Sequence, residues 1–327
     1  MTLRLKLLIV VGLLALLASP ALAADPIKMD LNAIYGPTSF HTQGAMTFAE
    51  KAAEYSGGSV DITVHPGGSL GFKGPELLKV VKDAQVPMSD VLMGVVAGSA
   101  HVFGVSSLPR LVLTYEDARK LYDQCRPLYD AAAAKWNQKI LYAAPWPPSG
   151  LVTGKAIAAP ADLDGLKTRT YDKNGAEFLQ TLGAAPVSLP WGEVYSSLRT
   201  GMIDSVLTSA ESAKNGKFWE VLSHFTTINY AYPLNMVTIN LDYWNALSKE
   251  QQDALLKAAR ETEAIQWKGS SDRNTESREV IQENGIEIRE ESPELTMAMN
   301  RAAKTIIQEY MTDADDELQT VLRRFIK

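Results

Sequence analysis

The stretch of residues 162–204 constrains the fold of this chain more than any other part of its sequence. Its apolar and turn-forming residues predict a strand, a helix, a second strand and a second helix, at about residues 167–171, 174–182, 185–188 and 191–200. Alternation of strand and helix is typical of an α/β layer with parallel strands. Arg169 then lies near the carboxyl end of the first strand, the edge at which small ligands bind in open α/β sheets. Arg169 is therefore the principal candidate for a ligand-binding residue.

The first residues have the pattern of a cleaved secretory signal peptide. Arg4 and Lys6 form a short basic start, an apolar run covers residues 7–18, and small residues precede Ala24. The apolar run is too short to span a bilayer, and no later segment is longer. We expect residues 1–23 to be removed and the mature protein to be soluble in the bacterial periplasm.

The charge and size of the chain exclude some functions. The net charge is −6, and loss of the signal leaves 30 basic against 38 acidic residues. No stripe of Lys and Arg is present, which argues against nucleic acid or an anionic membrane surface as a partner. The roughly 300 mature residues exceed what one hydrophobic core usually supports, so we expect two domains.

The order of predicted elements places the two domain crossings. A β-α-β pattern from Ile27 predicts the first domain, and the Pro-rich residues 145–150 predict the first crossing. The chain crosses back at about residues 233–235. We predict that domain one contains residues 24–147 and 235–270 and that domain two contains residues 148–234 and 271–327.

Two long helical patterns carry further predictions. A pattern at residues 248–284 starts with a capping box and ends before Gly285; at 1.5 Å per residue it spans about 54 Å, so it must lie across both domains. A second pattern at residues 115–137 contains Pro127, which we expect to break or kink it. We expect the helices of residues 294–327 to pack on domain two.

The sequence lacks the common signatures of catalysis and of metal or cofactor binding. Its four histidines are widely separated, and the patterns HExxH, CxxC, GxSxG and GxGxxG are missing. We therefore expect no metal centre, no cofactor and no catalytic site. A periplasmic enzyme with a scattered triad stays open as an alternative.

Several motifs, taken together, resemble one family. The motifs DLxGLKxR, LGAxPVxL and EVYxxLxTGxID follow one another in residues 162–204, and HPGGSLG, SLP and FWEV occur at residues 65–71, 107–109 and 218–221. In this order and spacing they resemble the solute-binding subunit of the tripartite ATP-independent periplasmic (TRAP) transporters. The resemblance implies a two-domain α/β periplasmic-binding-protein fold with crossing strands, a hinge and a long helix across both domains. It also implies delivery of a small organic acid to the small and large membrane subunits. We expect a monomer.

The resemblance also implies which residues bind the solute. Arg169 stands at the place of the family's ligand arginine, where its guanidinium would hold a carboxylate by two parallel hydrogen bonds. Trp191 stands where the family places an aromatic residue against the ligand. Other positions implied to face the cleft are Thr208, Ser209, Glu211, Tyr35, Leu92 and Gly94.

Two departures from the family pattern suggest the kind of solute. Many members carry a second arginine where this chain has Ser149, and the place of an acidic contact in sialic-acid-binding members falls near the apolar Leu92. We therefore expect a solute that is smaller or more apolar than a sialic acid, such as a monocarboxylate, with Trp146 and Trp191 as walls. Two alternatives stay open: a cationic amine enclosed by the aromatic residues, and a ligand-sensing subunit for a membrane receptor.

Overall fold

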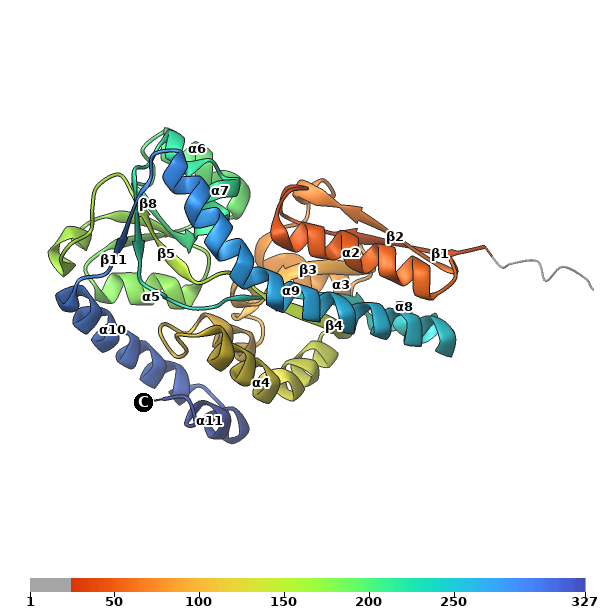
Figure 1. Cartoon of the computed structure of the whole chain (residues 1–327). Coiled ribbons are helices and arrows are strands. Elements are labelled where there is room, and N and C mark those ends of the chain that lie inside the picture. The colour runs from red at the N-terminus through yellow and green to blue at the C-terminus, as the bar shows by residue number, and fades with distance from the viewer. Residues whose placement is uncertain (1–24, 327) are drawn as a thin grey trace, which may run out of the picture.

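A computed structural model describes residues 25–326, which form two α/β lobes (Figure 1). The first lobe is built on a five-stranded sheet with the order β2 (Val60–His65), β1 (Ile27–Asn32), β3 (Met88–Leu92), β10 (Leu234–Asn240) and β4 (Gln138–Pro145). Its helices are α2 (Phe40–Tyr55), α3 (Leu77–Lys82), α4 (Tyr115–Lys135) and α8 (Leu241–Ala246), with the 3₁₀ helices η1 (Pro66–Gly68), η2 (Gly74–Glu76), η3 (Met93–Val96) and η4 (His101–Ser107). The expected signal peptide at residues 1–23 lies outside the described residues.

The second lobe is built on a six-stranded sheet. Its strand order is β11 (Glu287–Glu290), β9 (His224–Thr227), β5 (Ser149–Thr153), β8 (Ser205–Ser209), β6 (Lys167–Thr170) and β7 (Ala185–Ser188). Its helices are α5 (Lys173–Thr181), α6 (Val194–Arg199) and α7 (Ala210–Asn215), with η5 (Pro160–Leu163), η6 (Trp191–Glu193) and η7 (Phe218–Glu220). The α/β two-lobed fold and the strands and helices expected within residues 162–204 are confirmed.

Both sheets are mixed, whereas the alternation of strand and helix predicts parallel strands. In the first sheet β10 runs antiparallel to β3 and β4, and in the second sheet β5 runs antiparallel to β8 and β9. These two strands enter their sheets directly from the other lobe, without the helical crossover that a parallel neighbour needs. Their direction therefore follows from the crossings between lobes.

The two crossing segments are hydrogen-bonded to each other. The first leads from β4 to β5 and the second from β9 to β10. The Trp146 amide donates to the Pro233 carbonyl (2.8 Å), and the Ser149 and Tyr230 segments exchange further backbone bonds. A paired connection of this kind restricts the relative motion of the lobes to a hinge. The exact domain boundaries stay a prediction.

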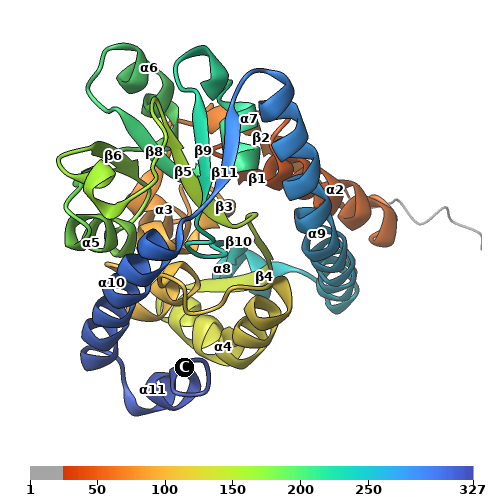
Figure 2. The ribbon, with the colours of Figure 1, turned by 60° about the vertical axis from the view of Figure 1, so that its left-hand side comes forward.

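A single helix, α9 (Lys249–Glu283), spans both lobes, as expected from its length (Figures 1 and 2). The Ser248 hydroxyl accepts from the Gln251 amide, and the Gln251 side chain accepts from the Ser248 amide, which completes the predicted capping box. The helix contacts α2 and β4 of the first lobe and α7 and β11 of the second. None of the helices between residues 25 and 326 is both long and apolar enough to cross a membrane.

Two expectations about helices need correction: the break at Pro127 does not occur, although a kink there stays a prediction, and the packing of the C-terminal helices differs in part. Helix α4 runs unbroken through Pro127, because Pro127 and the Asp123 carbonyl that it leaves unpaired lie on the exposed face, where water can bond that carbonyl, while the opposite face packs into the core. The C-terminal helices do not all pack on the second lobe. Helix α10 (Pro293–Thr312) packs on α5 there, whereas α11 (Asp316–Leu322) packs on α4, since its apolar residues join the core of the first lobe.

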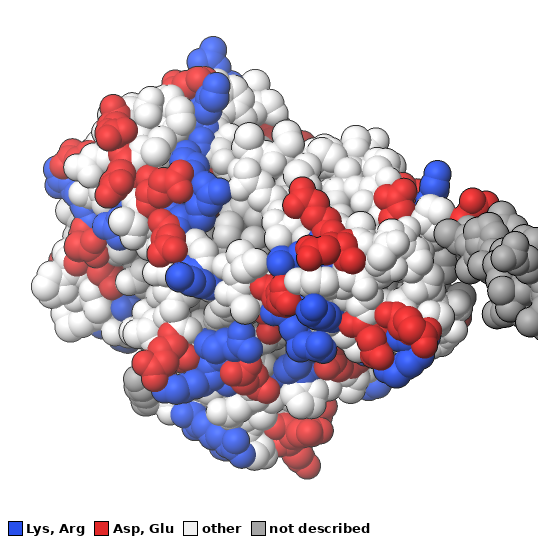
Figure 3. Space-filling model, turned by 45° about the vertical axis from the view of Figure 1, so that its right-hand side comes forward, with Lys and Arg blue, Asp and Glu red and all other residues white. Residues whose placement is uncertain are grey.

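Charged side chains of both signs are mixed over the surface. On the face shown in Figure 3, acidic and basic groups of the described residues are interspersed around a broad uncharged area. This face therefore has no extended basic surface of the kind that binds nucleic acid.

Candidate functional site

A cavity of about 940 Å³ lies between the two lobes. Nine of the ten residues expected to bind a ligand line it: Tyr35, Leu92, Gly94, Trp146, Ser149, Arg169, Trp191, Thr208 and Ser209. They come from strands of both sheets, from loops and 3₁₀ helices that follow such strands, and from the first crossing segment. The edges of the two sheets that face each other therefore bring together residues that are far apart in the sequence.

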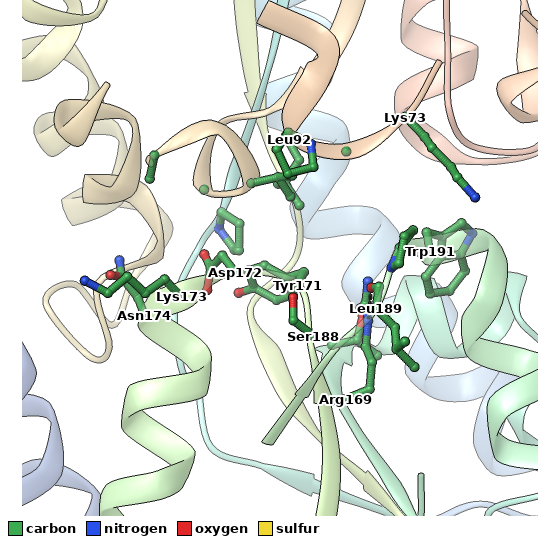
Figure 4. A pocket seen from close by; sticks show the side chains of 18 of the residues that line it. Lys73, Leu92, Arg169, Tyr171, Asp172, Lys173, Asn174, Ser188, Leu189 and Trp191 are labelled. Atoms are coloured by element: carbon green, nitrogen blue, oxygen red, sulfur yellow. Dashed lines mark hydrogen bonds between the residues drawn. The ribbon is translucent and has the colours of Figure 1, made fainter. Parts of the chain in front are cut away.

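Arg169 is the buried cation of this cavity. It lies on β6 between β7 and β8 and is 4% exposed. Its Nε donates to the Leu189 carbonyl (3.0 Å), and no carboxylate of the described residues lies within ion-pair distance of its guanidinium. Burial lowers the pKa of Arg169 to about 10, so it stays charged at neutral pH. Figure 4 shows Arg169 extending into the space between the lobes, with Leu92 on the opposite side.

Three residues of the second lobe with hydroxyl side chains, Ser149, Thr208 and Ser209, line the same cavity as Arg169. The Ser149 hydroxyl, at the expected place of a second arginine, lies 3.3 Å from the Tyr171 hydroxyl. Thr208 ends strand β8 as a buried residue that faces the cavity. The Ser209 hydroxyl accepts from the Ser212 amide (3.2 Å) as the N-cap of α7, so it is already engaged within the protein. Arg169 is thus the buried cation that the second lobe presents beside these hydroxyl groups, whereas Lys173, which also lines the cavity, is exposed.

Apolar and aromatic side chains form the opposite wall. Tyr35, Leu92 and Trp146 make a small cluster, and Tyr171 and Trp191 of the second lobe pack against it. The rings of Tyr35 and Trp146 meet edge to face, with centroids 5.0 Å apart. A planar or cyclic solute fits such walls better than a flexible, heavily hydroxylated one.

The start of α5 joins the two lobes along the rim of the cavity. Asn174 Nδ2 donates to the Gly104 carbonyl of the first lobe (2.9 Å). Asp172 caps α5 by accepting from the Gly175 amide (2.9 Å), and its other oxygen lies so close to Gly94 that a Cβ added there would approach it to 2.3 Å. Burial raises the pKa of Asp172 to about 6. Asp172 and Asn174 are not among the residues predicted to bind a ligand, although an Asp directly before a predicted helix is a capping signal.

Glu211 is the one expected ligand-binding residue that the structure places elsewhere. It is fully buried, and its carboxylate accepts from the Ser277 hydroxyl of α9 (2.5 Å) and pairs with Lys214 (3.1 Å). This is a correction: Glu211 ties α7 to the long helix. Because α7 starts at Ala210, the Glu211 side chain turns toward α9 and away from the cavity.

No group of three His, Cys, Asp or Glu side chains within residues 25–326 is arranged to hold a metal ion. The arrangement can instead bind a small anion by charge and by shape. A buried guanidinium without an internal acid favours an anionic guest, and the aromatic wall limits its size.

Comparison with known proteins is consistent with this chemistry. The model of the family described as "Bacterial extracellular solute-binding protein, family 7" matches residues 31–313. The C4-dicarboxylate-binding periplasmic protein DctP of Rhodobacter capsulatus is 28% identical over 308 residues, which cover 92% of this chain and 89% of that protein.

Two solved structures superpose closely on this chain. A TRAP solute-binding protein from a marine metagenome, specific for pyroglutamate and crystallised with co-purified pyroglutamate, is 31% identical with a TM-score of 0.89, and the match covers 92% of this chain and 99% of that one. An extracytoplasmic solute receptor of Bordetella pertussis that binds pyroglutamic acid is 25% identical with a TM-score of 0.89, covering 92% of this chain and 100% of that one.

Proposed function

This chain belongs to the bacterial extracellular solute-binding proteins of family 7, which serve TRAP transporters, and from that premise we propose that it captures a small organic acid with a single carboxylate. Like the rest of its family, it is a periplasmic binding protein and not an enzyme. In this proposal it delivers the acid to the small and large membrane subunits of a TRAP transporter.

The buried, unpaired guanidinium of Arg169 carries the proposal. A solute without an anion would leave this charge desolvated and unsatisfied, which penalises neutral solutes. Arg169 is the one buried cation among the lining residues, and Ser149 supplies no second one, which favours a single carboxylate over two; the lining residues Lys73 and Lys173 are exposed. The aromatic wall then favours a small ring as the rest of the solute.

Pyroglutamate is the best-supported probe. It is a five-membered lactam with one carboxylate, and the two similar solved structures are of proteins that bind it. The carboxylate would meet Arg169, the lactam ring would lie between Trp146 and Trp191, and the lactam N–H and C=O would bond hydroxyls such as that of Thr208. Contacts from both lobes would favour the closed state of the hinge.

The test is a melting-shift screen of small acids, sugar acids and amines, followed by calorimetry on the best acid. At a concentration one hundredfold above Kd, a ligand should stabilise the protein by about 2.7 kcal/mol. Arg169→Ala should cost roughly 2 to 5 kcal/mol of binding free energy, or about 30-fold to several-thousand-fold in Kd. Arg199→Ala, which removes an exposed arginine from α6, is the control. A screen in which amines alone raise the melting temperature would replace the carboxylate by a cation.

A further inference from the structure

A buried acid lies behind the aromatic wall of the cavity. Asp90, on β3, is 1% exposed, and its Oδ1 accepts from Asn235 Nδ2 on β10 (2.8 Å). Its Oδ2 has no hydrogen-bond partner among the described residues. Burial raises the pKa of Asp90 to about 7. Burying a carboxyl group that has one amide partner and no neighbouring cation costs folding free energy. Such a group therefore suggests a role other than packing.

The Asn235 amide connects this acid to the cavity wall. Its Oδ1 accepts from the indole Nε1–H of Trp146 (2.7 Å). The indole N–H can only donate, so it requires the oxygen end of the amide. The carboxyl group offers an accepting oxygen in either protonation state, so it holds the nitrogen end. The two partners therefore determine the orientation of the Asn235 amide. If the amide were reversed, its NH₂ group would face the indole N–H of Trp146, and both groups are donors.

Among residues 25–326, the indole of Trp146 has no hydrogen-bond partner other than Asn235. Its ring packs against Tyr35 and against His41, whose centroid is 4.3 Å away. Burial lowers the pKa of His41 to about 3, so that ring is neutral and contributes packing rather than charge. Aromatic packing alone permits several tilts of a ring, whereas the bond to Asn235 selects one. The selected tilt therefore fixes the surface that Trp146 presents to the cavity.

We propose that Asp90 and Asn235 are positioning residues of the solute site. Asp90 holds the Asn235 amide in one orientation, that amide fixes the tilt of the Trp146 indole, and the fixed indole restricts the cavity to small acids. The effect on solute size rests on the proposed function, whereas the orientation of the indole can be tested without a solute.

The first arm observes the indole directly by NMR of ¹⁵N-labelled protein. The chain has six tryptophans, and the Trp146 indole signal is assigned by its loss in Trp146→Phe. Asp90→Leu should shift that signal, because the amide loses the partner that orients it, and Asp90→Asn should restore it, because a carboxamide oxygen again accepts from Asn235. Ser89→Ala is the matched control: Ser89 directly precedes Asp90 on β3, so its side chain lies on the other face of the sheet, where its hydroxyl accepts from Asn32 Nδ2 (3.2 Å).

The second arm measures affinity for pyroglutamate and for D-glucuronate by calorimetry. Asp90→Leu should bind pyroglutamate roughly 3- to 30-fold more weakly, and the ratio of the two affinities should move toward the larger acid. In the Trp146→Phe background, Asp90→Leu should have no further effect, since the group it acts through is gone.

Each outcome is decisive. A Trp146 signal that is unchanged in Asp90→Leu, or that moves equally in Ser89→Ala, overturns the positioning role, as do additive losses in the double variant. If wild type binds neither acid, pyroglutamate fails as the proposed solute, while the NMR arm still decides whether Asp90 orients Trp146.

Discussion

The two lobes bury charge on either side of one cavity, and they use it differently. In the second lobe, Arg169 opens into the cavity, and within the described part of the chain its one hydrogen-bond partner is the Leu189 carbonyl. In the first lobe, Asp90 lies behind the wall, and the surface presented to the cavity includes the apolar and aromatic cluster of Tyr35, Leu92 and Trp146. A buried charged group can recognise a solute only if it faces the cavity, as Arg169 does. A charged group behind the wall, such as Asp90, can only shape the wall.

The proposed function assigns a different task to each lobe. The second lobe selects for an anion, because only an anion compensates its buried guanidinium. The first lobe selects for size, because its wall is apolar and closely packed. Removing the charge of the second lobe should weaken binding of every acid, whereas altering the wall of the first lobe should change which size of acid binds. The following variants test this difference between the lobes.

Arg169→Lys should give the largest effect. Lysine keeps the positive charge but loses the planar fork that holds a carboxylate by two bonds. The loss of one charge-assisted hydrogen bond, about 1.5 to 3 kcal/mol, corresponds to about 10- to 150-fold in the Kd for pyroglutamate. Calorimetry measures the change, with Arg199→Lys on the exposed end of α6 as control. Unchanged affinity would mean that the positive charge of residue 169 is sufficient and that the two parallel hydrogen bonds of the guanidinium contribute nothing.

Gly94→Ala should disturb the contact between the lobes. The added Cβ would lie 2.3 Å from Asp172 Oδ2 and 2.7 Å from Ser107 Oγ, and Asp172 is held in place as the cap of α5. Overpacking of this kind costs about 1 to 3 kcal/mol, so affinity should fall roughly 5- to 150-fold. Small-angle scattering should show a less compact protein at saturating pyroglutamate.

Gly98→Ala is the control for this variant, because a Cβ at Gly98 meets no atom within 4 Å. Equal affinities of the two alanine variants would show that the rim contact at Asp172 plays no part in closure.

The buried acids of the two lobes should make stability depend on pH. Burial raises the pKa of Asp90 from 3.8 to about 7, so the folded protein keeps a proton there that the unfolded chain has lost. The stabilisation is complete below about pH 4 and is lost as pH rises toward about 7, at up to about 1.4 kcal/mol per pH unit. Urea unfolding of wild type and Asp90→Asn at several pH values measures this slope, which the variant should lack.

Asp172 offers the matching measurement on the second lobe. The pKa of Asp172 is raised from 3.8 to about 6. Its contribution to the fall in unfolding free energy should therefore end near pH 6, about one pH unit below that of Asp90, and Asp172→Asn should remove it. Parallel stability curves for wild type and both variants would contradict the assignment of these protons.

Thr208→Val should have the smallest effect. It removes one hydroxyl from the cavity at nearly constant shape, and a neutral hydrogen bond contributes about 0.5 to 1.5 kcal/mol. The Kd for pyroglutamate should rise about 2- to 10-fold. Thr226→Val removes a buried hydroxyl of β9 that has no partner among the described residues and does not line the cavity, so it is the control. A loss that is equal in the two variants would point to a general effect on the second lobe.

The sequence by itself determined what lies within a short window of residues. The alternation in residues 162–204 predicted β6, α5, β7 and α6, and it placed Arg169 at the edge of a strand. The length and capping box of α9 predicted a helix across both lobes. The short strands β9 and β11 escaped prediction, because four residues with weak alternation carry too little periodic signal.

Only the tertiary structure decided which distant residues meet. It turned Glu211 away from the cavity and onto α9, seated α11 on α4, and brought Asp172 against Gly94. It also joined Asp90, Asn235 and Trp146, which lie on two strands and a crossing segment. Periodicity within an element reports its own buried face, whereas contacts between elements depend on strand order and lobe packing. Those follow from the burial of the whole chain at once, and no local pattern contains them.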